Sequence, residues 1–298
     1  MADTITFGKV TAVPIAPVRG KGYWASVITR LVHDPVAMAA LAVILTIVLA
    51  AIFAPYLGLA DPYRGSILRR LRPIGFTGYP FGSDELGRDM LTRLIYGGRL
   101  SLVMGVTPVL LAFFVGSTTG IVAAYIGGWV NMVVMRVIDV FFAFPSVLLA
   151  IALSGALGAG IVNSIVSLTI VFIPQIARIA EAVTTQTRNR DFVEAARISG
   201  AGTLTIIRVH VLGNVLGPIF VYATSLISVS MILSSGLSFL GLGVKPPDPE
   251  WGLMLNTLRT AIYSQPLVAA LPGAMIFMTS ISFNLFSDGL RTAMEVRQ

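Results

Sequence analysis

Long stretches without a charged residue dominate the pattern of this chain. Five of them follow one another, at residues 35–60, 100–135, 140–177, 209–244 and 260–287. A helix needs about 20 apolar residues to cross a bilayer, so the third stretch is long enough for two spans. The sequence GALGAG at 155–160 separates the two, because glycine continues a helix poorly and favours turns. The pattern predicts six spans, near 36–58, 101–126, 131–154, 161–185, 214–240 and 266–288.

Composition agrees with this pattern. Hydrophobic residues make up 55% of the 298 and charged residues only 12%, about half the charged fraction of a soluble domain. We therefore expect an all-α polytopic membrane protein. Residues 1–34 are polar and contain several prolines and glycines, which predicts a loosely ordered arm. The first apolar stretch is too long for the core of a signal peptide, so it is expected to stay as an anchor.

Several classes of chemistry are disfavoured. The chain has no cysteine and two histidines, which argues against disulfides, thiolate chemistry and a zinc site. The net charge of +7 is spread over loops without interleaved aromatic residues, so nucleic acid is not an expected partner. No G-x-x-x-x-G-K-[ST] sequence occurs, so ATP, if used, is expected to bind to another subunit.

A short polar segment at residues 191–200 lies between the fourth and fifth predicted spans. We expect Asp191 to be the N-cap of a short helix, Glu194 to complete a capping box, and Gly200 to end the helix in a left-handed conformation. One face of this helix would carry Phe192, Ala195, Ala196 and Ser199. These small residues would let another protein approach closely, although an ordinary solvated or membrane-surface helix fits the pattern equally well.

The order Glu194-Ala195-Ala196, three residues, then Gly200 resembles the EAA loop of bacterial ABC importer permeases. Glycine at 213 departs from the proline that is usual in that family. Other segments are similar to the C-type permease of dipeptide and oligopeptide importers, in the same order: FGSDELGRD at 81–89, YGGRLSL at 96–102, GGW at 127–129, MR at 135–136 with Asp139, FPS at 144–146, GLSFLGLG at 236–243, PP at 246–247, PEWG at 249–252, FNL at 283–285 and GLR at 289–291.

The resemblance implies a type I ABC importer transmembrane domain. Its EAA loop would be the coupling helix, which sits in a cleft of a cytoplasmic ATPase through Asp191, Phe192, Glu194, Ala195, Ala196, Arg197 and Gly200. The implied partners are a B-type permease, two ATPases that bind ATP and Mg, an external substrate-binding protein, a peptide and membrane lipid. The chain itself would hold no cofactor. Relatives carry other solutes as well, such as nickel chelates, glutathione or sugars.

The coupling loop also decides the predicted topology, because it must face the cytoplasm. Only a small majority of lysines and arginines lies in the inner segments, so charge alone supports this orientation weakly. We expect a bacterial inner membrane protein with a cytoplasmic arm at 1–34, a permease domain at 35–292 and a cytoplasmic tail at 293–298. Within the domain, 61–98 would be an external loop and 187–212 the cytoplasmic coupling loop.

Other residues carry local expectations. Arg136 and Asp139 are one helical turn apart and are expected to pair within the third span. Pro145 and Pro174 should kink their spans. The G-x-x-x-G at 116–120 suits close helix packing, either within the chain or in a dimer. The charged residues of the loop at 61–98 predict an ion-paired lid, which is either a solvated loop or a contact for the binding protein.

The fifth span carries a stripe of mostly hydroxyl-bearing residues within an arc of about 80°. Its members are Thr224, Ser228, Met231, Ser235 and Ser238. They are candidates for the wall of a water-filled translocation path, while packing against another helix explains the stripe equally well. A passive six-helix channel or an intramembrane enzyme would be the alternatives to a permease. The sequence shows no catalytic constellation that an intramembrane enzyme would need. A passive channel would have no reason to carry an EAA-type helix.

Overall fold

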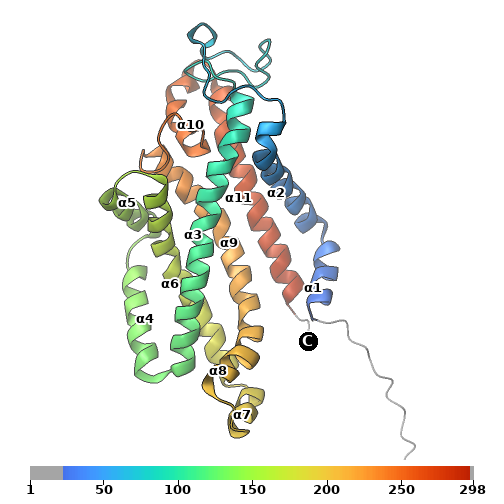
Figure 1. The fold of residues 1–298 in the computed structure, drawn as a ribbon, viewed down its shortest axis with the longest axis vertical. Coiled ribbons are helices and arrows are strands. Elements are labelled where there is room, and N and C mark those ends of the chain that lie inside the picture. The colour runs from blue at the N-terminus through green and yellow to red at the C-terminus, as the bar shows by residue number, and fades with distance from the viewer. Residues whose placement is uncertain (1–22, 296–298) are drawn as a thin grey trace, which may run out of the picture.

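The computed structural model describes residues 23–295, and the described part of the chain is almost entirely helical (Figure 1). The long helices are α2 (Pro35–Phe53), α3 (Met90–Ile126), α6 (Ile161–Arg188), α9 (Leu212–Phe239) and α11 (Pro266–Met294). Shorter helices are α1 (Tyr23–Val32), α4 (Gly128–Phe142), α5 (Ser146–Leu157), α7 (Asp191–Ile198), α8 (Thr203–Thr205), α10 (Trp251–Thr257) and the 3-10 turns η1 (Ala54–Tyr56), η2 (Ile67–Arg69) and η4 (Arg259–Tyr263). A π-helical stretch, η3 (Ile206–Val211), joins α8 to α9.

The predicted all-α membrane fold is confirmed. Within residues 23–295, five helices are long and apolar enough to cross a membrane, and the pair α4 and α5 makes the sixth span if it is counted as one. The third span bends at Pro145, as predicted: α4 and α5 meet at 89°. Pro145 causes the break, since it lacks an N–H and disfavours a helical conformation at Phe144. By contrast, α6 continues as one helix through Pro174.

Two predicted boundaries differ from the structure for physical reasons. Residues 23–32 form α1 instead of a loose arm, because Val27 and Leu31 pack against Val221 and Leu290. Residues 1–22 of the predicted arm lie outside the described part. The second and fifth spans begin earlier than predicted and are each 37 residues long, which corresponds to about 55 Å of helix. Because a bilayer core is about 30 Å thick, these helices continue beyond the membrane.

The core of the molecule is the contact between α3 and α6. A Cβ atom added at Gly116 would lie 2.8 Å from the Ile173 carbonyl oxygen, and one at Gly120 would lie 2.7 Å from the Ala180 Cβ. The two glycines therefore bring the α3 backbone against the α6 backbone. The G-x-x-x-G sequence serves a partner helix of the same chain.

A buried polar cluster fixes α10 against α3 at the opposite end of the bundle from α7. The Trp251 indole N–H donates to the Leu94 carbonyl at 2.8 Å, and its ring lies over Gly97 and Gly98. The Glu250 carboxylate accepts bonds from the Leu253 N–H at 2.8 Å and from the Ser101 hydroxyl at 3.1 Å. Burial raises the pKa of Glu250, while these donors oppose the rise. The PEWG and YGGRLSL segments thus form one structural unit.

Replacing Gly120 with valine should destabilise the chain by about 1–3 kcal/mol, because the added atoms would push α3 away from α6. Gly155→Ala is the matched control, since no atom lies within 4 Å of a Cβ placed there. Thermal unfolding of the purified protein in detergent checks the prediction. Equal unfolding temperatures for Gly120→Val and the wild type would show that the contact is not tight.

Candidate coupling helix and translocation path

Helix α7 lies at the end of the molecule opposite the loop that joins α2 to α3 (Figure 1). Val193 is its anchor: the side chain is fully buried in the cluster that contains Ile206 and Val211 of η3. The Phe192 ring lies beside the His210 ring, with 6.5 Å between centroids. The helix is therefore packed on the base of the α9 span by one face.

The beginning of α7 differs from the predicted capping box. Arg190 is the N-cap residue, with an extended backbone, and its carbonyl accepts the N–H groups of Val193 at 2.9 Å and Glu194 at 3.2 Å. Asp191 is already inside the helix, so its side chain does not cap the N-terminus. Asp191 and Glu194 instead place two carboxylates in the first turn, where the helix dipole favours negative charge.

The end of α7 has the predicted left-handed glycine. Gly200 has φ of 80°, the Ala201 N–H donates to the Ala196 carbonyl at 3.1 Å, and the Gly200 N–H donates to the Arg197 carbonyl at 3.1 Å. These two bonds make a complete Schellman motif. The chain reverses sharply after Ile198 and enters α8, so the helix is closed at both ends.

The other face of α7 has no partner among the described residues. Ile198 is 80% exposed, and Glu194, Ala195 and Arg197 are also exposed, whereas Phe192, beside His210, is 44% exposed. Ala196 is half-buried. A mixed apolar and charged face on a short, closed helix outside the spans suits binding to another protein.

Arg188 is a residue that sequence reasoning missed. Its guanidinium donates to the carbonyls of Ala124 at 2.8 Å and Tyr125 at 3.2 Å, at the end of α3. It therefore satisfies carbonyls that have no partner in the helix and ties α6 to α3 directly before α7. An arginine three residues before the coupling segment was the available signal, but its partners are remote in sequence.

The predicted hydroxyl stripe of α9 faces several neighbours. Met231 is fully buried and packs against Gly105 of α3. Ser235 packs against Gly252 of α10, because a Cβ added to Gly252 would lie 2.6 Å from the Ser235 Cα. Ser238 is fully buried, and its oxygen accepts the Val244 N–H at 3.4 Å. Thr224 shares a hydrogen bond of 3.0 Å with Ser287 of α11. In this conformation these four residues pack within the chain.

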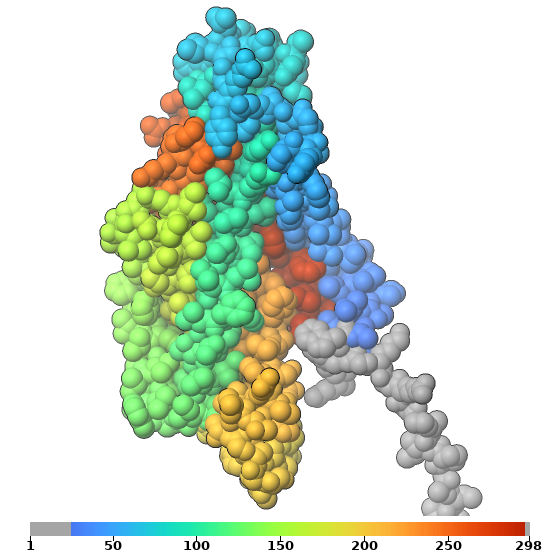
Figure 2. All heavy atoms as spheres, in the orientation of Figure 1, coloured from blue at the N-terminus to red at the C-terminus, as the bar shows by residue number. Residues whose placement is uncertain are grey.

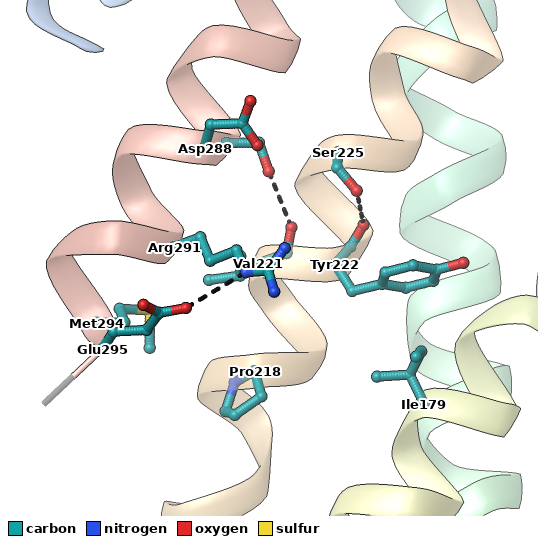
Figure 3. Close-up of a pocket in the computed structure, with 10 residues that line it drawn as sticks. Ile179, Pro218, Val221, Tyr222, Ser225, Asp288, Arg291, Met294 and Glu295 are labelled. Atoms are coloured by element: carbon teal, nitrogen blue, oxygen red, sulfur yellow. Dashed lines mark hydrogen bonds and ion pairs between the residues drawn. The ribbon is translucent and has the colours of Figure 1, made fainter.

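Ser228 differs because it lines a cavity of about 510 Å³ between α9 and α11. A second cavity, of about 560 Å³, lies between α6, α9 and α11. In Figure 3, Tyr222 and Ser225 of α9 and Asp288 and Arg291 of α11 surround this second cavity. The Arg291 Nε lies 3.5 Å from a Glu295 carboxylate oxygen.

The α11 side of these cavities was not predicted, although the sequence carries a signal. Ser280, Asn284, Ser287, Asp288 and Arg291 fall within an arc of about 100° on one helix face. Asn284, Asp288 and Arg291 are exposed. Because such side chains are costly in lipid, this face suits water or a partner chain.

The intramembrane ion pair also differs from the prediction. Asp139 of α4 pairs with Arg178 of α6, not with Arg136. Both side chains of the pair are 42% exposed, and the Arg178 guanidinium lies 5.9 Å from the centre of the Phe142 ring. The reason is tertiary, since packing of α4 on α6 supplies a closer cation. The pair joins the bent third span to the helix that precedes α7.

No cluster suited to a metal ion occurs in residues 23–295. In these residues, five long spans, or six if α4 and α5 count as one, with a closed, exposed helix between two of them, define a polytopic membrane protein. A family described as binding-protein-dependent transport system inner membrane component matches residues 116–298, and one described as the N-terminal TM domain of oligopeptide transport permease C matches residues 22–73. The chain belongs to this family of inner membrane permeases, and within it to the C-type subunits, as the sequence resemblance predicted.

Curated relatives cover nearly the whole chain. The di/tripeptide transport system permease protein DppC of Pseudomonas aeruginosa is 38% identical over 280 residues, which is 92% of this chain and 91% of the relative. The glutathione transport system permease protein GsiD of Pectobacterium atrosepticum is 38% identical over 272 residues, 91% of this chain and 90% of the relative. The dipeptide transport system permease protein DppC of Alkalihalophilus pseudofirmus is 37% identical over 272 residues, 91% and 89% respectively.

Proposed function

We propose that this chain is the C-type permease of an ATP-driven importer of short peptides, and that α7 couples it to a cytoplasmic ATPase. The observation that carries the proposal is the exposed face of α7 on a helix that is buried through Val193 and closed at Gly200. Relatives named for di- and tripeptides, dipeptides and glutathione support a short peptide as substrate. Glutathione or another small solute is the alternative cargo.

The mechanism follows from how α7 is held. Arg188 fixes the end of α6 to α3, and η3 fixes α7 to α9, so a push on α7 reaches three spans. A short rigid helix transmits displacement without absorbing it. Closure of two ATPases around ATP and Mg would move the coupling helices together and exchange inward-open and outward-open states. This chain would carry no ATPase activity of its own.

The cavities between α9 and α11 support a translocation path at this face, shared with a B-type permease. A peptide carries donors and acceptors that would be unsatisfied in lipid, and its charged ends need polar partners. Ser228 and Asn284 supply such groups in one cavity, called the groove below, and Asp288 and Arg291 supply them in the other. Of the predicted stripe, Ser228 remains the member best placed to contact substrate, and the others would do so only after a rearrangement.

Gly200→Val tests the coupling. A valine in a left-handed conformation costs about 1–2 kcal/mol, so the Schellman motif should open and the α7 face should be misplaced. Substrate-stimulated ATP hydrolysis and peptide uptake by the reconstituted importer should fall at least about tenfold, a loss of about 1.4 kcal/mol in coupling. Gly202→Ala is the control, because both positions are open but only Gly200 has a positive φ. Normal stimulation in Gly200→Val, with the permease present in the membrane, would overturn the assignment of α7.

Orientation is tested with single cysteines, since the chain has none. Cysteine at Thr77, an exposed residue of the loop that joins α2 to α3, should react with an impermeant thiol reagent from outside intact cells. Cysteine at Gln186, exposed at the end of α6, should react only after permeabilisation. Ser83 is unsuitable because it is fully buried. The opposite labelling pattern would invert the topology and exclude a cytoplasmic ATPase at α7.

Reagent access also tests the path. In the assembled importer, cysteines at Ser228 and Asn284 should react with a small water-soluble thiol reagent in at least one nucleotide state, because these residues line the groove. Cysteine at Leu45 is the control, since this exposed α2 residue would face lipid and should stay unreactive. Protection of 228 and 284 in every state would mean that the groove is closed by packing.

A further inference from the structure

The loop at 57–89, between α2 and α3, forms the outermost end of the molecule. In Figures 1 and 2 it extends past the ends of α2, α3, α10 and α11, at the end opposite α7. Since α3 alone corresponds to about 55 Å of helix, its first turns and this loop lie well beyond a bilayer core of about 30 Å. The tip of the loop is therefore remote from lipid.

The acidic residues near the end of this loop form ion pairs or cap a helix within the chain. Asp84 is 2% exposed, and its carboxylate accepts the Arg88 Nε–H at 2.6 Å. The same carboxylate pairs with Arg93, whose Nε lies 3.2 Å from Oδ2. Glu85 pairs with Arg88 at 3.1 Å. Asp89 caps α3 by accepting the Thr92 N–H at 2.9 Å. The predicted ion-paired lid is present, but Asp84, Arg88 and Arg93 are buried in it, so these residues add no exposed charge to the loop.

Four arginines of the same loop remain exposed, at 64, 69, 70 and 72. None of them pairs with an acidic residue anywhere in residues 23–295. Arg69 lies over the Tyr79 ring at 5.5 Å and Arg72 over the Phe76 ring at 5.0 Å, so aromatic rings orient two of the guanidinium groups. Asp61 is also exposed in this loop, but the other three acids are buried or half-buried, so the exposed charge of the loop is mainly positive.

Two large apolar side chains stand between these arginines. Ile67 is 86% exposed and Leu68 is 85% exposed, both in the 3-10 turn η2. The turn is held in place: the Arg72 N–H donates to the Ser83 oxygen at 2.8 Å, and the Leu71 N–H donates to the Asp84 carbonyl at 3.1 Å. A fixed turn that exposes two aliphatic side chains to water is typical of a binding surface.

We propose that Ile67 and Leu68, surrounded by Arg64, Arg69, Arg70 and Arg72, form a docking tip for the external substrate-binding protein. The inference rests on the proposed function, because only an importer needs such a partner. Charge complementarity defines the partner's surface: an apolar recess that receives the two aliphatic side chains, within a rim of aspartate and glutamate. The arginines steer the encounter and the apolar pair keeps the complex together.

The test measures affinity between the reconstituted importer, in nanodiscs, and the peptide-loaded binding protein that stimulates its ATP hydrolysis. Arg64→Gln/Arg70→Gln should weaken binding about five- to tenfold at low salt, and this difference should shrink at high salt. Leu68→Ser should weaken binding by a similar factor at both salt concentrations, because its contribution is apolar. The side chains of Arg64 and Arg70 make no hydrogen bond or ion pair within residues 23–295, so folding should be unaffected.

Controls separate the possible outcomes. Arg259→Gln, at an exposed arginine of η4, should bind as the wild type does. Equal affinity in the loop variants and the wild type would overturn the docking tip alone. If the loss disappears when anionic nanodisc lipid is replaced by zwitterionic lipid, the tip binds headgroups and the proposal is wrong. If no peptide-loaded binding protein stimulates the wild type, the proposed function fails and the docking tip fails with it.

Discussion

The close packing of α3 on α6 is the constraint on which the rest of the structure depends. Gly116 and Gly120 allow the two backbones to touch, and Arg188 closes the pair by donating to the last carbonyls of α3. Without a hydrophobic driving force between helices in lipid, such contact and such hydrogen bonds are what hold spans together. α7 follows directly after α6 in the chain, so its first residue is held in place by this contact.

The two ends of the molecule use charge in different ways. At the end opposite α7, Asp84, Arg88 and Arg93 form a buried network with the half-buried Glu85, and this network holds the loop together. At the α7 end, Asp191 and Glu194 remain in the first turn of a helix and are exposed. Buried pairs fix a shape, whereas exposed charges are available to a partner. Both ends thus have a fixed shape with exposed charged residues, while the cavities lie in the apolar middle.

Sequence determined the approximate positions of the membrane-spanning helices because lipid imposes a simple rule. Charge-free stretches of sufficient length must be helices, and the glycines at 155–160 and Pro145 mark where they stop. Local chemistry also fixed Gly200, since a left-handed helix end favours glycine whatever surrounds it. The resemblance in the EAA segment singled out residues 191–200 as the candidate coupling helix before any contact was known.

Tertiary structure decided which partner each side chain meets. Asp139 is a helical turn from Arg136, yet it binds Arg178, because the bend at Pro145 and the packing of α4 on α6 bring that guanidinium closer. The α9 stripe has one periodicity, yet only Ser228 reaches a cavity, because α3 and α10 cover the positions of Met231 and Ser235. The periodicity of polar residues along one helix specifies which residues share a face of that helix. Which face meets water depends on helices that are remote in the sequence.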